Sequence, residues 1–274
     1  YHGSATGIST TPNYILETNT ANSYMGSSVA GLGDINGDGY SDIVAGGYLA
    51  AYPSTGEGAA WIFLGSATGL NPTPRHRLEQ NFGSAQFGYA VAGAGGVDGD
   101  GYNDVGVGGH KIKEPITAPA VTGGIYVYHG SANALGVGAN PLPARAFATT
   151  GYSTRNGWAV SSAGDVNGDG YSDIIIGDWQ DQIGPESYEG VALVYHGSAT
   201  GINTTPATII EGGAANRYFG RSASTAGDVN GDGYADVIIG CIRWSSGESN
   251  EGAAFVHLGS PTGINSSAFL RYEP

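Results

Sequence analysis

Side-chain oxygens at alternate positions mark a short segment, residues 34–42, that is suited to bind a hard metal ion. The side chains at these positions are Asp34, Asn36, Asp38 and Asp42. Glycines at 37 and 39 let the segment curl so that its oxygens converge. Tyr40 would add its backbone carbonyl, as the seventh position does in helical calcium loops. A set of several oxygen ligands favours Ca²⁺ over Mg²⁺, and the lack of His or Cys makes zinc a poor fit.

The same pattern recurs in register along the chain. Near-identical copies occupy 165–173 and 228–236, and an altered copy occupies 96–104. The candidate calcium ligands are Asp34, Asn36, Asp38, Tyr40, Asp42, Asp98, Asp100, Tyr102, Asp104, Asp165, Asn167, Asp169, Tyr171, Asp173, Asp228, Asn230, Asp232, Tyr234 and Asp236. In the altered copy Gly96 replaces the first aspartate, so we expect weaker binding there, with water filling the gap. The pattern predicts three strong sites and a weaker fourth, suited to millimolar extracellular calcium.

A turn without metal, an EF-hand and a dockerin loop can have similar sequences. The metal-free Asp/Asn/Gly turn is the simplest of these, but three copies in register, each with three carboxylates that repel one another, favour a bound cation. An EF-hand needs Glu at position 12, where this chain has Ala45, Ile176 or Ile239. A dockerin follows each loop with a helix, whereas these loops lead into β-branched runs typical of strands.

The loops belong to a longer repeat that must position them. Their starts at 34, 96, 165 and 228 are separated by 62, 69 and 63 residues, and a Gly-Ser motif recurs at 3, 65, 130, 197 and 259. Each unit reads as four short strands rich in β-branched, aromatic and small residues. Four strands per unit of this length are typical of a propeller blade, and β-solenoid repeats are shorter. The expected blades are 20–81, 82–150, 151–211 and 212–274, with 1–19 as the end of a preceding blade.

The repeat resembles the FG-GAP repeats of the integrin α-subunit N-terminal β-propeller, and still more those of secreted bacterial FG-GAP proteins. The Phe-Gly pair stands at 87–88 and 219–220, while the Gly-Ala-Pro element is altered in every unit. The resemblance covers essentially the whole chain. It implies an all-β, integrin-like β-propeller whose loops between the first two strands of each blade bind Ca²⁺.

The four blades leave one strand over. Residues 14–17 match the fourth strand expected at 208–211, yet the last unit already has its own candidate at 268–272. We therefore expect four four-stranded blades plus one surplus N-terminal strand. Three arrangements remain open: part of a longer propeller, closure by pairing with another copy, or a small ring. The first two, continuation into further blades and self-association, are favoured.

Residues that differ between units indicate where a partner binds. They lie between the second and third strands of each unit, on the face opposite the acidic loops in propeller topology. The candidates for a protein or glycan partner are Tyr48, His110, Trp179, Tyr188, Arg243 and Trp244. Aromatic side chains with mixed charges suit recognition, although they also suit ordinary packing between blades.

Composition excludes several function classes. Two lysines and eight arginines cannot build a broad basic face for nucleic acid, and no apolar stretch is long enough to cross a bilayer. The single cysteine, Cys241, allows no intrachain disulfide and reads as a buried apolar residue. Of 14 aspartates, 12 lie in the acidic loops, so four bound Ca²⁺ would change the net charge from −14 to −6.

The sequence predicts a secreted or cell-surface, calcium-binding β-propeller module for adhesion, protein–protein interaction or assembly. No catalytic motif such as Gly-x-Ser-x-Gly, His-Glu-x-x-His or a P-loop occurs, so we expect no enzyme. A carbohydrate-binding, lectin-like propeller is the alternative, and a polysaccharide-active propeller enzyme is the third hypothesis.

Overall fold

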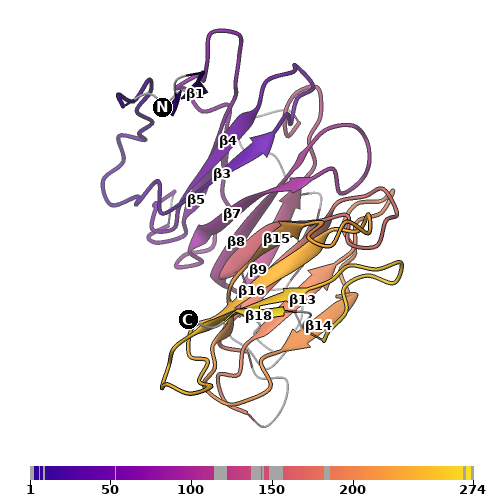
Figure 1. The fold of residues 1–274 in the computed structure, drawn as a ribbon. Helices are drawn as coiled ribbons and strands as arrows, with labels where there is room; N and C mark the ends of the chain where they lie inside the picture. Colours follow the sequence, from indigo (N-terminus) through magenta and orange to yellow (C-terminus); the bar gives the residue numbers. More distant parts are fainter. Residues whose placement is uncertain are drawn as a thin grey trace.

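The chain forms an all-β structure, seen here in a computed structural model. It describes residues 3–5, 7–8, 10–52, 54–113, 122–136, 143, 145–147, 157–181, 186–267 and 270–272. All regular secondary structure in these ranges is β-strand, and they hold no helix that could cross a membrane (Figure 1). Four antiparallel sheets have four strands each, in chain order within each sheet. The predicted fold of four four-stranded blades is confirmed.

The blades are numbered here in chain order. Blade 1 contains β3 (Ser28–Gly33), β4 (Asp42–Gly47), β5 (Ala59–Phe63) and β6 (His76–Leu78). Blade 2 contains β7 (Phe87–Gly95), β8 (Asp104–Lys113), β9 (Thr122–Tyr128) and β10 (Arg145–Phe147). Blade 3 contains β11 (Ala159–Gly164), β12 (Asp173–Asp178), β13 (Val191–Tyr195) and β14 (Thr208–Glu211). Blade 4 contains β15 (Phe219–Gly227), β16 (Asp236–Cys241), β17 (Ala253–His257) and β18 (Leu270–Tyr272).

The middle strands of a blade are buried on both faces because neighbouring sheets pack face to face. Every residue of β5 and of β13 is buried, which explains why these segments are continuous apolar runs and not alternating ones. Three hydrophobic clusters join successive blades. Their members include Val44 and Val107 between blades 1 and 2, Ile125 and Ile176 between blades 2 and 3, and Val194 and Ile239 between blades 3 and 4.

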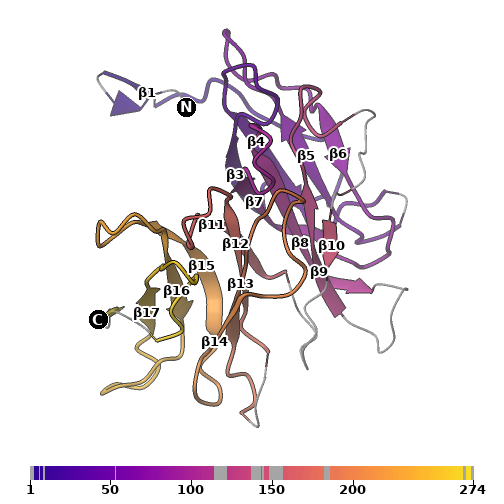
Figure 2. The ribbon, with the colours of Figure 1, turned by 90° about the vertical axis from the view of Figure 1, so that its right-hand side faces the viewer.

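The inner strands approach one another closely, which accounts for some of the abundant glycine. A Cβ on Gly93 of β7 would lie 2.7 Å from the carbonyl oxygen of Gly31 in β3. No side chain fits at that distance, so glycine at this position lets the two blades meet. The four sheets follow one another as an open arc, with blade 1 and blade 4 at its two ends (Figure 2).

The N-terminal residues lie at the end of the arc formed by blade 1. β1 (Gly3–Ser4) and β2 (Gly7–Ile8) pair as a small hairpin, and residues 14–17 form no regular strand, although their counterparts form β14. The Tyr14 hydroxyl donates to the Thr68 carbonyl (2.9 Å), and Leu16 packs on the outer cluster of blade 1. Ile8 and Ile15 remain 75% and 77% exposed. The surplus segment therefore covers blade 1 without completing a sheet.

Candidate metal loops and the opposite aromatic face

Each acidic loop connects the first and second strands of its blade, so all four loops have the same place in the fold. A β-bulge precedes each loop. After the bulge, a glycine with positive φ pairs with the last aspartate of the loop, as Gly33 (φ 69°) does with Asp42. Gly37 and Gly39 have φ of 76° and 87°, a conformation that glycine adopts without steric cost. The glycines noted in the sequence therefore give the loop its curl.

The first aspartate organises the loop by accepting hydrogen bonds from the backbone. Asp34 Oδ1 accepts from the N–H groups of Asn36 (3.2 Å), Gly37 (2.6 Å) and Asp38 (3.2 Å). Asp34 Oδ2 accepts from Gly39 N–H (2.7 Å). In the third and fourth loops Asp165 and Asp228 accept from the glycines at the same positions. The three loops predicted as strong sites thus share one geometry.

The third and fifth positions lie side by side in these three loops. Asn36 Nδ2 donates to Asp38 Oδ2 at 2.9 Å, and Asn167 and Asn230 make the same bond to Asp169 and Asp232 at 2.8 Å. Asp38 Oδ1 also accepts from Tyr40 N–H (2.9 Å). These side chains are solvent-accessible, so a cation can reach their oxygens.

The last aspartate of each loop is buried and joins the loop to the rest of its blade. Asp42 is 0% exposed; its Oδ2 accepts from Ile35 N–H (3.0 Å) and its Oδ1 from Gly65 N–H (2.8 Å). Asp104, Asp173 and Asp236 are equally buried and make the equivalent pairs of bonds. The glycine donors are those of the Gly-Ser motifs, which explains why the two motifs recur together.

Burial and hydrogen bonding act in opposite directions on the loop carboxylates. Burial raises the pKa of Asp104 and of Asp173 to about 7, and the neighbouring loop aspartates add to this effect. The hydrogen bonds that these two carboxylates accept act in the opposite direction but are outweighed. Burial also raises the pKa of Asp42. For Asp34 the effect of burial is outweighed by four backbone N–H groups, which lower its pKa; backbone bonds led by Gly233 lower the pKa of Asp228. A nearby cation would favour the ionised form of every one of these groups.

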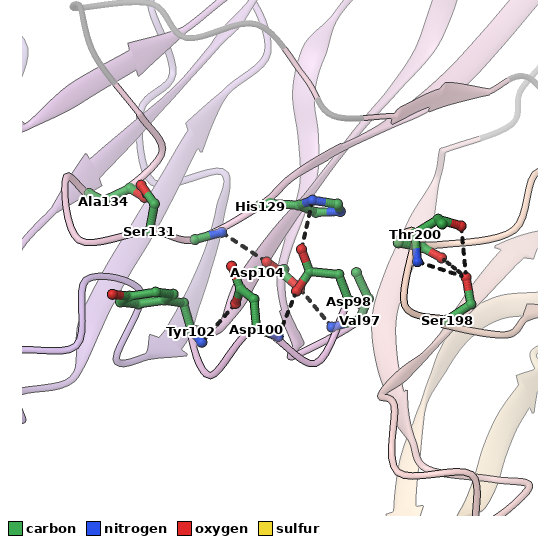
Figure 3. A network of polar contacts seen from close by, with 12 residues as sticks. Val97, Asp98, Asp100, Tyr102, Asp104, His129, Ser131, Ala134, Ser198 and Thr200 are labelled. Atoms are coloured by element: carbon green, nitrogen blue, oxygen red, sulfur yellow. Dashed lines mark hydrogen bonds and ion pairs between the residues drawn. The ribbon is translucent and has the colours of Figure 1, made fainter.

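The second loop differs from the other three, as its sequence predicts. With Gly96 at the first position, no carboxylate gathers the loop N–H groups, and Asp98 Oδ2 instead faces His129 Nδ1 at 2.9 Å (Figure 3). Asp100 Oδ1 still accepts from Tyr102 N–H (2.9 Å). His129 therefore already interacts with one of the three carboxylates of this loop.

The donor set fits a hard cation in its chemistry. Among the described residues, no group of three or more His, Cys, Asp or Glu side chains converges on one point in a metal-binding arrangement. The loop carboxylates accept hydrogen bonds from backbone N–H groups of their own loop, and the last aspartate of each loop also accepts from a glycine of the Gly-Ser motif. Each carboxylate has about four lone-pair sites, so these hydrogen bonds leave acceptor capacity for a cation. In the first, third and fourth loops, every side chain that would bind the metal is Asp or Asn and offers oxygen, and none of the five ligand positions is His or Cys.

The opposite ends of the same strands carry a row of aromatic rings. β4 and β12 start at the last loop aspartate and end just before Tyr48 and Trp179. The aromatic row comprises Tyr24, Tyr48, Tyr89, His110, Trp158, Trp179, Tyr188 and Tyr218. Successive ring centroids lie 4.7–6.0 Å apart in the order Tyr24, Tyr48, Tyr89, Trp158, Trp179, Tyr218, Tyr188. The row therefore runs across all four blades.

The structure separates the predicted partner residues into two groups. Tyr48, Trp179 and Tyr188 belong to the aromatic row, and Arg243 lies over its Tyr218 ring (4.2 Å). His110 also belongs to it but is buried at 3% exposure, where it supports Tyr89 and Trp158. Trp244 lies apart from the row, against Phe255 and beneath Arg217.

Sequence reasoning missed five residues of this surface, namely Tyr24, Tyr89, Trp158 and Tyr218 of the aromatic row and Arg221 beside it. Tyr89, Trp158 and Arg221 each follow a glycine near the start of the first strand of a blade, at 88, 157 and 220. Arg221 lies 4.6 Å above the Trp158 ring, a cation–π distance. The residue after that glycine differs between units, as Ser27, Tyr89, Trp158 and Arg221, and this variation is the signal that could have found these three.

Comparison with known proteins agrees with this architecture. Residues 25–63 match the profile of the FG-GAP repeat, and residues 165–239 match that of an FG-GAP-like repeat. The chain is 31% identical over 237 residues to integrin alpha-V of Gallus gallus, covering 80% of this chain and 20% of the integrin. It is 31% identical over 223 residues to integrin alpha-6 of Homo sapiens, covering 81% and 18%. Integrin alpha-8 of Gallus gallus is 29% identical over 257 residues, covering 92% and 22%. The chain thus spans about a fifth of these relatives.

Proposed function

We propose that this FG-GAP, integrin-like propeller is a calcium-stabilised, non-catalytic extracellular module for adhesion or assembly. The observation that carries the proposal is the repeated loop, in which three copies share one hydrogen-bond geometry and an all-oxygen donor set. Similarity to integrin alpha proteins supports an extracellular, adhesion-type propeller. The same similarity supports a secreted or cell-surface location, where millimolar calcium would suit the loops.

The residues that would hold calcium are those of the five loop positions. Asp34, Asn36, Asp38 and Asp42 would supply side-chain oxygens, and Tyr40 its backbone carbonyl, with the matching residues in the third and fourth loops. The second loop would bind more weakly because Gly96 supplies no ligand and His129 already faces Asp98. Bound Ca²⁺ would neutralise carboxylates that otherwise repel one another within each loop.

Thermal unfolding in calcium and in EDTA tests the stabilising role. A ligand bound only by the native state stabilises it by about 2.7 kcal/mol per site at a hundredfold excess over Kd. We expect the melting temperature to be much higher in calcium, and magnesium at equal concentration to have a smaller effect. Equal melting temperatures in calcium and EDTA would contradict the proposal.

The aromatic row is the proposed partner face. Its half-exposed rings and the charges of Arg221 and Arg243 offer a protein partner apolar area together with cationic groups. Calcium-dependent cell adhesion to a surface coated with the chain tests this face. We expect Trp179→Ala to reduce adhesion and Ile209→Ala, on the exposed outer strand β14, to leave it unchanged.

A lectin-like function is the second candidate, because half-exposed Trp158 and Trp179 are adjacent (5.3 Å) and sugars stack on aromatic faces. Binding on a glycan array that is lost in Trp179→Ala and kept in Trp244→Ala would favour this function. Trp244 is the matched control because it lies outside the row. Turnover of a polysaccharide by the purified chain would contradict the non-catalytic assignment.

A further inference from the structure

A histidine in the third strand of blade 4 replaces a benzene ring that the other three blades have at the same position. His257 stands two residues before the glycine of its Gly-Ser motif, where blades 1 to 3 have Phe63, Tyr128 and Tyr195. The strand register agrees, because each of the four residues pairs with the residue that follows the last loop aspartate of its own blade. The smaller imidazole therefore occupies the place of a phenol or phenyl ring.

The side chain across the interface is also smaller between blades 3 and 4. Between blades 1 and 2, Tyr128 is buried, and its hydroxyl accepts a hydrogen bond from Gln80 Nε2 (2.7 Å). Leu78 and Ile210 occupy the same register position in blades 1 and 3, so the counterpart of Gln80 is Gly212. The interface between blades 3 and 4 therefore has neither the phenol ring nor the amide that meet between blades 1 and 2.

A hollow of about 260 Å³ lies at this interface. This interblade hollow is lined by Phe219, Trp244, Phe255 and His257 of blade 4, and by residues 210–213 of blade 3 and its following turn. The ring centroid of Phe255 lies 5.6 Å from that of Phe219 and 5.1 Å from that of Trp244. An apolar cavity of about 150 Å³ can hold benzene, so the interblade hollow has room for a substituted aromatic ring.

His257 offers a hydrogen-bond acceptor at the hollow. Its Nδ1 lies 3.1 Å from the carbonyl oxygen of Asn265, and because a carbonyl oxygen only accepts, Nδ1 carries the proton and Nε2 of the neutral ring carries a lone pair. Burial lowers the pKa of His257 against the effect of the Asn265 bond, which keeps the ring neutral at neutral pH. His257 is 2% exposed, and its Nε2 has no hydrogen-bond partner among the described residues. A ligand that donates one hydrogen bond would satisfy this buried acceptor.

The charges at the interblade hollow balance one another. Arg217 donates from Nη1 to the Gly212 carbonyl (2.7 Å), and its guanidinium carbon lies 3.9 Å from the centroid of the Trp244 ring. Glu211 is exposed and also lines the hollow. With one cation, one carboxylate and a neutral imidazole among the described lining residues, the hollow favours a neutral ligand over an ion.

We propose that the interblade hollow binds a phenol, whose ring packs among Phe219, Trp244 and Phe255 and whose hydroxyl donates to His257 Nε2. A phenol is the occupant because the Tyr128 ring fills the equivalent space between blades 1 and 2, and because a buried acceptor lies among aromatic walls. A free phenol and a tyrosine side chain of a partner protein share this chemistry. The hollow is separate from the acidic loops and from the aromatic row, so the proposal does not rest on their function.

Isothermal titration calorimetry with p-cresol, the analogue of a tyrosine side chain, tests this proposal. We expect p-cresol to bind at one site per chain. The ring of p-methylanisole has the same shape but no hydroxyl proton, so we expect binding about five- to tenfold weaker, the effect of one hydrogen bond to a neutral acceptor. No binding of p-cresol, or equal binding of the two compounds, would overturn the proposal.

A third compound, N-acetyltyrosinamide, distinguishes the two sources of the phenol. Binding at least as tight as that of p-cresol would support a tyrosine of a partner protein. Weaker binding, with p-cresol still bound, would support a free phenol, because the peptide groups would then be excluded from the hollow.

Substitution of His257 tests whether p-cresol binds in the interblade hollow. His257→Tyr gives blade 4 the residue that blades 2 and 3 have at this position, so we expect the fold to persist and the new ring to abolish p-cresol binding. Ile209→Ala is the control, because Ile209 is 43% exposed and precedes the buried Ile210, so it lies on the opposite face of β14. This control should bind p-cresol as wild type does. Unchanged binding in His257→Tyr would overturn the proposal.

Nitrogen NMR of histidine-labelled wild type gives a readout that needs no substitution. A hydrogen bond to the lone pair of Nε2 shifts its resonance, so we expect p-cresol to move the His257 Nε2 signal and p-methylanisole to leave it nearly unchanged. The Nε2 of His196 is the internal control, since it is also buried without a hydrogen-bond partner among the described residues but lies outside the hollow. A His257 signal that p-cresol does not move would contradict the proposal.

Discussion

The aspartates of one loop have different physical roles, although their sequence positions look equivalent. Asp34 is accessible and gathers the N–H groups of its own loop, whereas Asp42 is fully buried and bonds to Ile35 and Gly65. The buried position is aspartate in all four loops, including the one that lacks the first ligand. We infer that this buried aspartate is needed for the fold, whether or not a cation is bound.

Buried carboxylates make the metal-free chain sensitive to pH. The folded pKa of Asp104 and Asp173 is raised to about 7 from an ordinary value of 3.8. Their contribution to stability is therefore fully present below about pH 4 and is lost as the pH rises through 7. In EDTA we expect each group to lower the free energy of unfolding by up to about 1.4 kcal/mol per pH unit in this window.

Urea unfolding in EDTA between pH 5 and 8, on wild type and Asp173→Asn, measures this effect. The slope with pH is expected to be shallower in the variant. Comparing slopes removes the contribution of His196 and His257, whose pKa values burial lowers and which act in the opposite sense. Identical slopes would contradict the assigned protonation of Asp173.

At the scale of elements, the loops also hold neighbouring blades together. Tyr171 packs on Gly99 of the preceding loop, while a Cβ on Gly101, two residues further on, would meet nothing within 4 Å. Both glycines have positive φ, at 69° and 97°. The two glycines form a matched pair, because both have the strained backbone of a positive φ but only Gly99 contacts the neighbouring blade.

Alanine substitutions at this pair separate the two effects. Gly101→Ala is expected to cost about 1 kcal/mol, the penalty of a left-handed conformation. Gly99→Ala is expected to cost clearly more, because its Cβ would lie 2.7 Å from the Tyr171 ring. Chemical denaturation of both variants measures the difference, and equal losses would show that Tyr171 contributes nothing to the interface.

Much of this architecture could be predicted from the repeat. The fixed place of the acidic loop and the continuous apolar runs specify four-stranded blades packed on both faces, and the structure has them. The aromatic row could not be predicted as a unit, because Tyr89, Trp158 and Trp179 meet only when blades from different parts of the chain are adjacent. For the same reason, the sequence alone does not show that Trp179 belongs to the aromatic row while Trp244 packs on Phe255 outside it.

At the scale of the whole molecule, the two ends of the strands carry different kinds of residue in every blade. Acidic loops lie at one end of the strands and the aromatic row at the other. The net charge of −14 is concentrated in the loops, since 12 of 14 aspartates lie there. Four bound Ca²⁺, as proposed, would reduce the net charge to −6.

The number of calcium ions bound per chain, measured by equilibrium dialysis and elemental analysis, tests the proposed calcium binding most directly. We predict three to four ions for wild type and the loss of one in each of Asp38→Asn, Asp169→Asn and Asp232→Asn, with no loss in the exposed control Glu211→Gln. A wild-type chain that retains no calcium, or loop variants that retain as much as wild type, would contradict the account.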